Sequence, residues 1–208
     1  MKDLIIVGAG GLGRELLSYI ESDNPIFKFK GFLDDRASIL DSTPRSPGII
    51  GAPNTFIPGS NQVYLAAIGD PHARHRYTQH LRQLDVDFGQ MVHPMAHLSA
   101  RSSIGRGSIV GPRAGISVDV KIGEFTYIQE YTVIGHDAVI GDWCQINSHC
   151  ILSGNCRIGN FVKIGPNCVV SNGAVIDDNV TVAPGSVVYG RIKSGLTVLG
   201  NPARQFAF

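Results

Sequence analysis

The chain has 208 residues, enough for one or two domains, with 18 lysines and arginines against 17 aspartates and glutamates. The resulting net charge of +1 gives no indication of nucleic acid or an anionic membrane as a partner. No apolar stretch approaches the roughly 20 residues that span a bilayer, and the N-terminus lacks the pattern of a secretory signal. We therefore expect a cytoplasmic protein without a nucleic-acid partner and without membrane insertion.

Residues 1–86 are predicted to form an α/β domain, half of a Rossmann fold. The run "DLIIV" indicates a buried strand. A glycine-rich turn follows, and then a helix with an apolar stripe formed by Leu12, Leu16, Leu17 and Ile20. A short strand at residues 49–50 lies in a loop-rich stretch, and "QVYLAAIGD" predicts a third parallel strand ending at Gly69. A second helix begins near Pro71, with Asp70 as its N-cap.

The glycine-rich turn indicates a nucleotide site. Gly8, Gly10 and Gly13 satisfy the spacing G-x-G-x-x-G between a strand and a helix. In such a turn the backbone amides receive phosphates, and an acidic residue ending the next strand receives a ribose hydroxyl. Asp34 and Asp35 stand at that second place. The alternative is that the glycines only make a tight turn. With so few β-α units, we expect room for one nucleotide.

Residues 87–208 carry a repeat of six residues. From Val92 to Val188 an aliphatic residue returns at every sixth position, which predicts a parallel β-helix. From Leu98 on, a small residue stands two positions before each aliphatic one, and both should point inward because residues two apart share a face of a strand. A glycine often follows the aliphatic residue, and we expect it to turn the corner with a positive φ.

The four cysteines, Cys144, Cys150, Cys156 and Cys168, all occupy the small inward positions of this repeat. Cys150 and Cys168 should stack on successive coils at about 4.8 Å, within reach of a disulfide. We expect free thiols that pack as small hydrophobic groups, because nothing else in the sequence indicates an oxidising compartment.

The repeat resembles the left-handed β-helix acyltransferases, in which three hexads form one coil of a triangular prism. The segments "VGAGGLGRE", "GFLDD", "LAAIGD", "MVHPMAHLS", "IGHDAVIG" and "GNPAR" resemble, more specifically, the bacterial sialic acid O-acetyltransferases and UDP-4-amino-sugar N-acetyltransferases. This resemblance spans almost the whole chain. It implies a homotrimer that moves an acetyl group from acetyl-CoA to the amino group of a nucleotide-linked sugar for surface glycan synthesis, without a metal.

The resemblance also implies site residues. His136 is the catalytic base and Asp137 its partner. The nucleotide-sugar site is lined by Gly10, Gly11, Leu12, Asp34, Asp35 and Gly69. Acetyl-CoA lies along stacked coils at Pro166 and Pro184, with Gln145 where some relatives carry a second histidine. Gly154, one coil above His136, is the candidate oxyanion donor through its backbone N–H.

A histidine suits this reaction because it titrates near neutrality, and a neighbouring aspartate stabilises its protonated form. It would take a proton from the attacking amine or hydroxyl. His149, which also lies outside the inward positions, is the alternative base, although no carboxylate follows it.

Three other functions remain open. One is O-acetylation of a sialic-acid-like sugar. Another is a γ-type carbonic anhydrase, which requires three histidines to bind zinc. Against it, we expect only two histidines in the coils, His136 and His149. The last is a non-catalytic trimeric scaffold that binds NAD through the glycine-rich turn.

Overall fold

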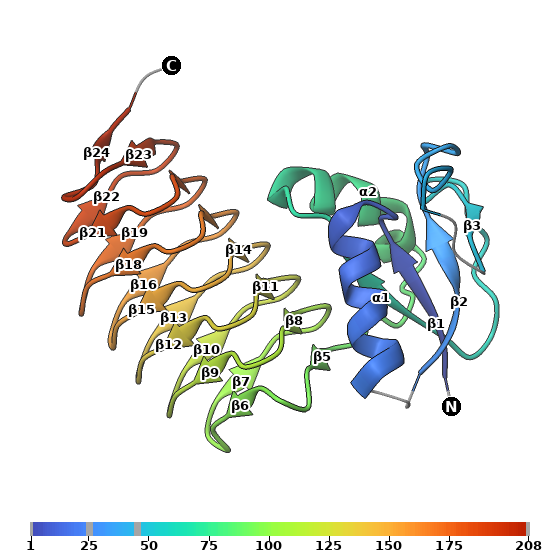
Figure 1. Ribbon diagram of the computed structural model, residues 1–208, viewed down its shortest axis with the longest axis horizontal. Helices are drawn as coiled ribbons and strands as arrows, with labels where there is room; N and C mark the ends of the chain where they lie inside the picture. The colour runs from blue at the N-terminus through green and yellow to red at the C-terminus, as the bar shows by residue number, and fades with distance from the viewer. Residues whose placement is uncertain (1, 24–26, 44–46, 207–208) are drawn as a thin grey trace. The chain divides into compact units, whose positions relative to one another are not determined.

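The computed structural model divides into two compact units between Gln90 and Met91. The described residues are 2–23, 27–43 and 47–206. The first unit is an α/β domain and the second is a left-handed parallel β-helix (Figure 1). The ring of Phe88 lies 5.9 Å from that of Tyr64, so the segment just beyond residue 86 packs within the first unit.

The α/β unit contains a parallel sheet of four strands in the order β3-β2-β1-β4. Its elements are β1 (Lys2–Val7), α1 (Gly11–Asp23), β2 (Phe27–Leu33), β3 (Ile49–Gly51), β4 (Gln62–Ala66) and α2 (Pro71–Gln83). The side chain of Asp70 caps α2 by accepting from the Ala73 N–H at 2.8 Å. Strand β1 lies between β2 and β4, so the connections diverge at its carboxyl end, the usual ligand position in an open α/β sheet.

The β-helix consists of three parallel sheets, which we name by their first strands. The β5 sheet contains β5 (Met91–Val92), β8 (Ile109–Val110), β11 (Tyr127–Ile128), β14 (Gln145–Ile146), β17 (Lys163–Ile164), β20 (Thr181–Val182), β23 (Thr197–Leu199) and the antiparallel β24 (Arg204–Gln205). The β6 sheet contains β6 (His97–Leu98), β9 (Gly115–Ile116), β12 (Val133–Ile134), β15 (Ile151–Leu152), β18 (Val169–Val170) and β21 (Val187–Val188). The β7 sheet contains β7 (Ser103–Ile104), β10 (Lys121–Ile122), β13 (Val139–Ile140), β16 (Arg157–Ile158), β19 (Val175–Ile176) and β22 (Arg191–Ile192).

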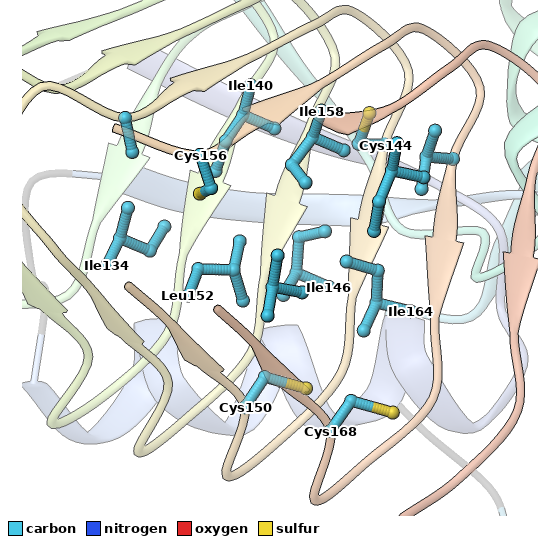
Figure 2. Close-up of a cluster of buried hydrophobic side chains, with 14 of the residues drawn as sticks. Ile134, Ile140, Cys144, Ile146, Cys150, Leu152, Cys156, Ile158, Ile164 and Cys168 are labelled. Carbon is cyan, nitrogen blue, oxygen red and sulfur yellow. The ribbon is translucent and has the colours of Figure 1, made fainter. Parts of the chain in front are cut away.

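The core of the β-helix is formed by the two inward positions of each hexad. The aliphatic and small side chains point together into the interior of the prism, as Figure 2 shows for ten labelled residues. Ile146 and Cys150, for example, are fully buried. The four cysteines are free thiols, as expected. Burial raises the pKa of the Cys156 thiol to about 11, so it stays uncharged near neutral pH.

The glycines at the corners differ from our expectation. Gly135, which follows Ile134, is not in the left-handed region; Asp137, two residues later, has a φ of 59°. Other corners repeat this pattern, as at Trp143 and His149. A Cβ on Gly135 would lie only 2.5 Å from the backbone nitrogen of Gly154 in the next coil. The glycine is therefore required by the close approach of neighbouring coils, and the prediction of a positive φ there was wrong.

The corner between the β7 and β5 sheets, called the Trp143 corner, is stabilised by stacked rings. The ring of Trp143 lies 4.2 Å from that of Phe125 and 6.1 Å from that of Phe161, all nearly parallel. Beside them the side chain of Asn160 accepts from the Asp142 N–H at 2.8 Å, which joins one coil to the next. These contacts account for polar and aromatic side chains that the repeat leaves outside the core.

Neither helix in the described parts of the chain has the length and apolar character needed to cross a membrane.

Candidate active site

His136 and Asp137 lie at the corner between the β6 and β7 sheets, called the His136 corner. The His136 Nδ1 lies 2.8 Å from Asp137 Oδ2, and 55% of each side chain is exposed. An ionised carboxylate only accepts hydrogen bonds, so it holds the proton on Nδ1 and leaves the lone pair on Nε2. The positive φ of Asp137 is a conformation that aspartate tolerates better than most residues. The pair is therefore arranged to keep Nε2 available as a proton acceptor.

Gly154 lies in the next coil directly against His136. The Asn155 N–H donates to the His136 carbonyl oxygen at 2.8 Å. A Cβ on Gly154 would lie 2.7 Å from His136 Nε2 and 2.8 Å from Cε1, so any larger residue would displace the imidazole. Among the described residues, no group accepts from the Gly154 N–H. The sequence therefore predicted correctly that Gly154 lies one coil above the histidine.

An open depression of about 480 Å³ lies beside the histidine on the outer face of the β6 sheet. It is lined by His97, Ser99, Gly115, Ile116, Ser117, Val118, Val133, Ile134, Gly135 and His136. His97 belongs to strand β6, so the count of only two coil histidines was wrong. Its place one residue before an aliphatic position was the signal that would have found it.

The other residues expected at the cofactor lie around a different corner. Pro166 and Pro184 lie at the corner between the β5 and β6 sheets, called the His149 corner. They are stacked on successive coils, since the Gly185 N–H donates to the Pro166 carbonyl oxygen at 2.9 Å. Gln145, in β14 just before this corner, is buried, and its Nε2 donates to Asn147 Oδ1 at 3.2 Å. One chain thus brings Gly154, but not these three residues, to His136.

His149 is engaged in a stack of side chains. Its ring lies parallel to that of Tyr131, with 4.8 Å between the ring centroids. The Arg113 guanidinium lies over the Tyr131 ring, 5.5 Å from the centroid of that ring. Arg113 also donates to the Tyr131 hydroxyl at 3.0 Å. No carboxylate of the described chain is hydrogen-bonded to His149, unlike His136. As a base, His149 lacks the orienting partner that His136 has.

The glycine-rich turn of the α/β unit borders a cavity of about 170 Å³. It is lined by Gly8, Gly10, Gly11, Leu12, Arg36, Ala67, Ile68 and Gly69, which includes four of the six predicted nucleotide-sugar residues. A Cβ on Gly13 would lie 2.0 Å from the Gly8 carbonyl oxygen, so only glycine allows α1 to pack this closely against the turn. We call this space the glycine-turn cavity.

A second cavity of about 220 Å³, the β2 cavity, opens beyond the end of β2. It is lined by Gly8, Leu33, Asp34, Asp35, Arg36, Pro53, Ile68, Ala73 and Tyr77. The two predicted carboxylates are therefore both present, and the Tyr77 hydroxyl donates to Asp35 at 2.9 Å. Sequence reasoning missed Arg36 and Tyr77. The cation directly after two aspartates was a signal for the first, whereas Tyr77 arrives from a distant helix.

Among the described residues, no group of three His, Cys, Asp or Glu side chains is arranged to hold a metal ion.

Two family models match the chain. Residues 3–81 match the PglD N-terminal domain, and residues 86–191, about half of the chain, match the GMPPB C-terminal domain and so belong to that family. No curated protein sequence matches significantly. The solved acetyltransferase domain of PglB from Neisseria gonorrhoeae FA1090 is 25% identical, with a TM-score of 0.85, over 99% of this chain and 100% of that one. The chain belongs to the left-handed β-helix acyltransferases of nucleotide sugars.

Two further solved structures share the fold of this acyltransferase along its whole length. WeeI from Acinetobacter baumannii AYE is 24% identical with a TM-score of 0.79, covering 99% of this chain and 100% of that one. The second is a mutant of perosamine N-acetyltransferase from Caulobacter crescentus in complex with CoA and GDP-perosamine. It is 20% identical with a TM-score of 0.88, covering 100% of this chain and 98% of that one. The predicted fold class is thereby confirmed in both halves of the acyltransferase.

Proposed function

We propose that this acyltransferase moves an acetyl group from acetyl-CoA to the amino group of a nucleotide-linked amino sugar, with His136 as general base. The observation that carries the proposal is the His136–Asp137 pair, which fixes Nδ1 at 2.8 Å from the carboxylate and leaves Nε2 beside Gly154. Two relatives support the donor and the acceptor. The PglB domain has been solved with acetyl coenzyme A, and the perosamine enzyme with CoA and GDP-perosamine.

In this mechanism the acceptor amine attacks the thioester carbonyl carbon of acetyl-CoA. His136 Nε2 takes the proton that the amine loses, and Asp137 stabilises the resulting imidazolium. The tetrahedral intermediate places negative charge on oxygen, and the Gly154 N–H is our candidate donor to it. When the C–S bond breaks, the imidazolium returns the proton to the CoA sulfur. A C–N bond has formed, and the base is restored.

We propose that the nucleotide end of the acceptor lies in the α/β unit, along Gly10, Gly11, Leu12 and Gly69 and near Asp34 and Asp35. Backbone amides at the start of a helix favour phosphate groups. The cavities at the glycine turn and at the end of β2 support this assignment.

We also propose a homotrimer, in which one chain supplies His136 and a neighbour supplies the acetyl-CoA edge at Gln145, Pro166 and Pro184. Two observations support it. These residues lie around a different corner from His136 in one chain, so a second copy is needed to bring them together. The outer face of the β6 sheet also exposes apolar side chains, 49% of Val133 and 50% of Ile151. A monomer by light scattering would contradict this assembly.

The test is a panel of nucleotide-linked 4-amino sugars, each paired with its 4-hydroxy counterpart, assayed by thiol release from acetyl-CoA. We expect turnover with at least one amino sugar and little with its hydroxyl partner. Preferred turnover of the hydroxyl compounds would favour O-acetylation instead. Thermal stabilisation by NAD but not by acetyl-CoA would favour the non-catalytic scaffold. We assign the reaction to the cytoplasm and to surface glycan synthesis.

A further inference from the structure

The carboxylate of Asp34 has no room for another hydrogen bond. Its Oδ2 accepts from the Ala9 N–H at 2.9 Å and from Arg36 Nη2 at 2.8 Å. Its Oδ1 accepts from the Arg36 backbone N–H at 3.1 Å and from Arg36 Nε at 2.8 Å. A carboxylate offers about four lone-pair positions, and all four are occupied. With a residue exposure of only 6%, Asp34 is not free to receive a ribose hydroxyl.

Asp34 instead holds two neighbours in place. Its bond to the Ala9 N–H fixes the glycine-rich turn, and its two-pronged bond to Arg36 fixes the guanidinium. Burial raises the pKa of Asp34, but the hydrogen bonds from Arg36 and Ala9 outweigh burial and hold the pKa below its usual value. The carboxylate is thus an anion at neutral pH, and it orients a cation.

The Arg36 guanidinium keeps free donors toward solvent. Its Nε and Nη2 are bonded to Asp34, whereas Nη1 has no partner among the described residues. The side chain is 62% exposed, although its ion-pair partner is buried. A Cβ on Gly10 would lie 3.9 Å from Arg36 Nη2, so the cation stands directly beside the glycine turn.

Arg36 also stands between the two cavities of the α/β unit. The glycine-turn cavity and the β2 cavity share Gly8, Arg36 and Ile68 as lining residues. The β2 cavity has apolar walls at Leu33 and Pro53, which suit a nucleoside. A ligand that fills both cavities must pass the guanidinium with its middle portion. In a nucleotide-linked sugar that portion is the diphosphate, and a planar guanidinium matches phosphate geometry.

We infer that Arg36 binds the diphosphate of the nucleotide-linked substrate and that Asp34 is a positioning residue that acts through Arg36 and Ala9. The inference rests on the proposed function. It assigns the anion-binding role to a residue outside the glycine turn, and it leaves Asp35 and Tyr77 as the polar groups for the nucleoside.

Calorimetric titration of the full chain with GDP, UDP, guanosine and uridine tests this inference. Arg36→Gln should weaken binding of the preferred diphosphate by roughly 10- to 100-fold and leave the nucleosides nearly unchanged. Arg36→Lys, which keeps the charge but loses the fork, should fall between. Lys30→Gln is the matched control, because this substitution removes the same positive charge at a residue that lines neither cavity. Lys30 pairs with Asp3.

Asp34→Asn should weaken diphosphate binding more in the wild-type background than in Arg36→Gln. The two losses should not add fully, because the part of the Asp34 effect that acts through Arg36 is already lost in the double variant. Diphosphate binding unchanged by Arg36→Gln, or equal losses for diphosphates and nucleosides, would overturn the inference. If neither diphosphate binds the wild-type chain, the nucleotide site of the proposed function falls with it. Binding that depends on Arg36 without acetyl transfer to any amino sugar would support the inference and overturn the proposed function alone.

Discussion

The two units of this acyltransferase hold their candidate functional side chains in different ways. In the β-helix, each coil repeats the one before it, so a residue's neighbours are found in the adjacent coil at the same corner. His136 and Gly154 illustrate this, because the second forms the surface on which the first rests. In the α/β unit, the site depends on single contacts between distant segments, such as Ala9 with Asp34 and Tyr77 with Asp35.

The two units should therefore differ in the substitutions that they tolerate. The β-helix has a redundant core of many similar coils, and exposed corner residues such as His136 lie outside that core. The carboxylate of Asp34, by contrast, serves both the glycine turn and Arg36. We expect activity and stability to separate in the β-helix and to be linked in the α/β unit.

The largest effect should come from His136→Ala. General acid–base catalysis contributes about 100- to 10,000-fold, so turnover measured by thiol release should fall by about that factor. The half-exposed side chain contributes little to packing, and circular dichroism should be unchanged. His149→Ala is the control and should retain most activity. Near-normal turnover in His136→Ala would refute the assignment of the base.

A core substitution should show the opposite behaviour. Ile146→Ala removes a fully buried side chain and should lower the free energy of unfolding by about 2–5 kcal/mol. Trp143 is the only tryptophan and lies in the β-helix, so its fluorescence reports the unfolding of that unit. Lys121→Ala, at an exposed position of β10, should change the unfolding free energy by less than about 0.5 kcal/mol. If the two variants lost equal free energy of unfolding, the assignment of Ile146 to the inward face and Lys121 to the outward face would be contradicted.

Gly154→Ala tests whether the coil above His136 positions it. The new methyl group would lie 2.7 Å from Nε2 and must displace the ring, so we expect roughly a 100-fold loss in kcat. Gly190→Ala is the matched control, because a Cβ there meets nothing within 4 Å. Similar kcat values for the two variants would show that the contact with Gly154 is unimportant.

The smallest effect should be the pH dependence of the α/β unit. Because folding lowers the pKa of Asp34 from its usual 3.8, the stability it contributes is complete well above that value and is lost as pH falls through the lower folded pKa. Asp34→Asn should destabilise the unit by roughly 1.5–3 kcal/mol at pH 7, and the difference from wild type should shrink in acid. Hydrogen exchange of the β1 amides measures the free energy of unfolding of the unit, and Asp41→Asn, at an exposed position, is the control. If the difference in this free energy between wild type and Asp34→Asn did not change with pH, the charge of Asp34 would not be its cause.

The architecture of both units follows from the amino-acid sequence alone. The period of six required a parallel β-helix and identified its core, because inward positions are set by the local alternation of a strand. The glycine turn, the capped second helix and the corner position of His136 also followed from local patterns. The family resemblance added acyl transfer and the pairing of His136 with Asp137.

How residues from separate segments meet became clear from the three-dimensional structure. It moved the positive φ from Gly135 to Asp137, because coil-to-coil contact is the constraint on that glycine. It brought His97 into the depression beside His136 and separated Pro166 and Pro184 from it. It also filled every acceptor position of Asp34 and left Arg36 exposed between two cavities. These outcomes depend on distances between distant segments, and no local pattern in the chain encodes them.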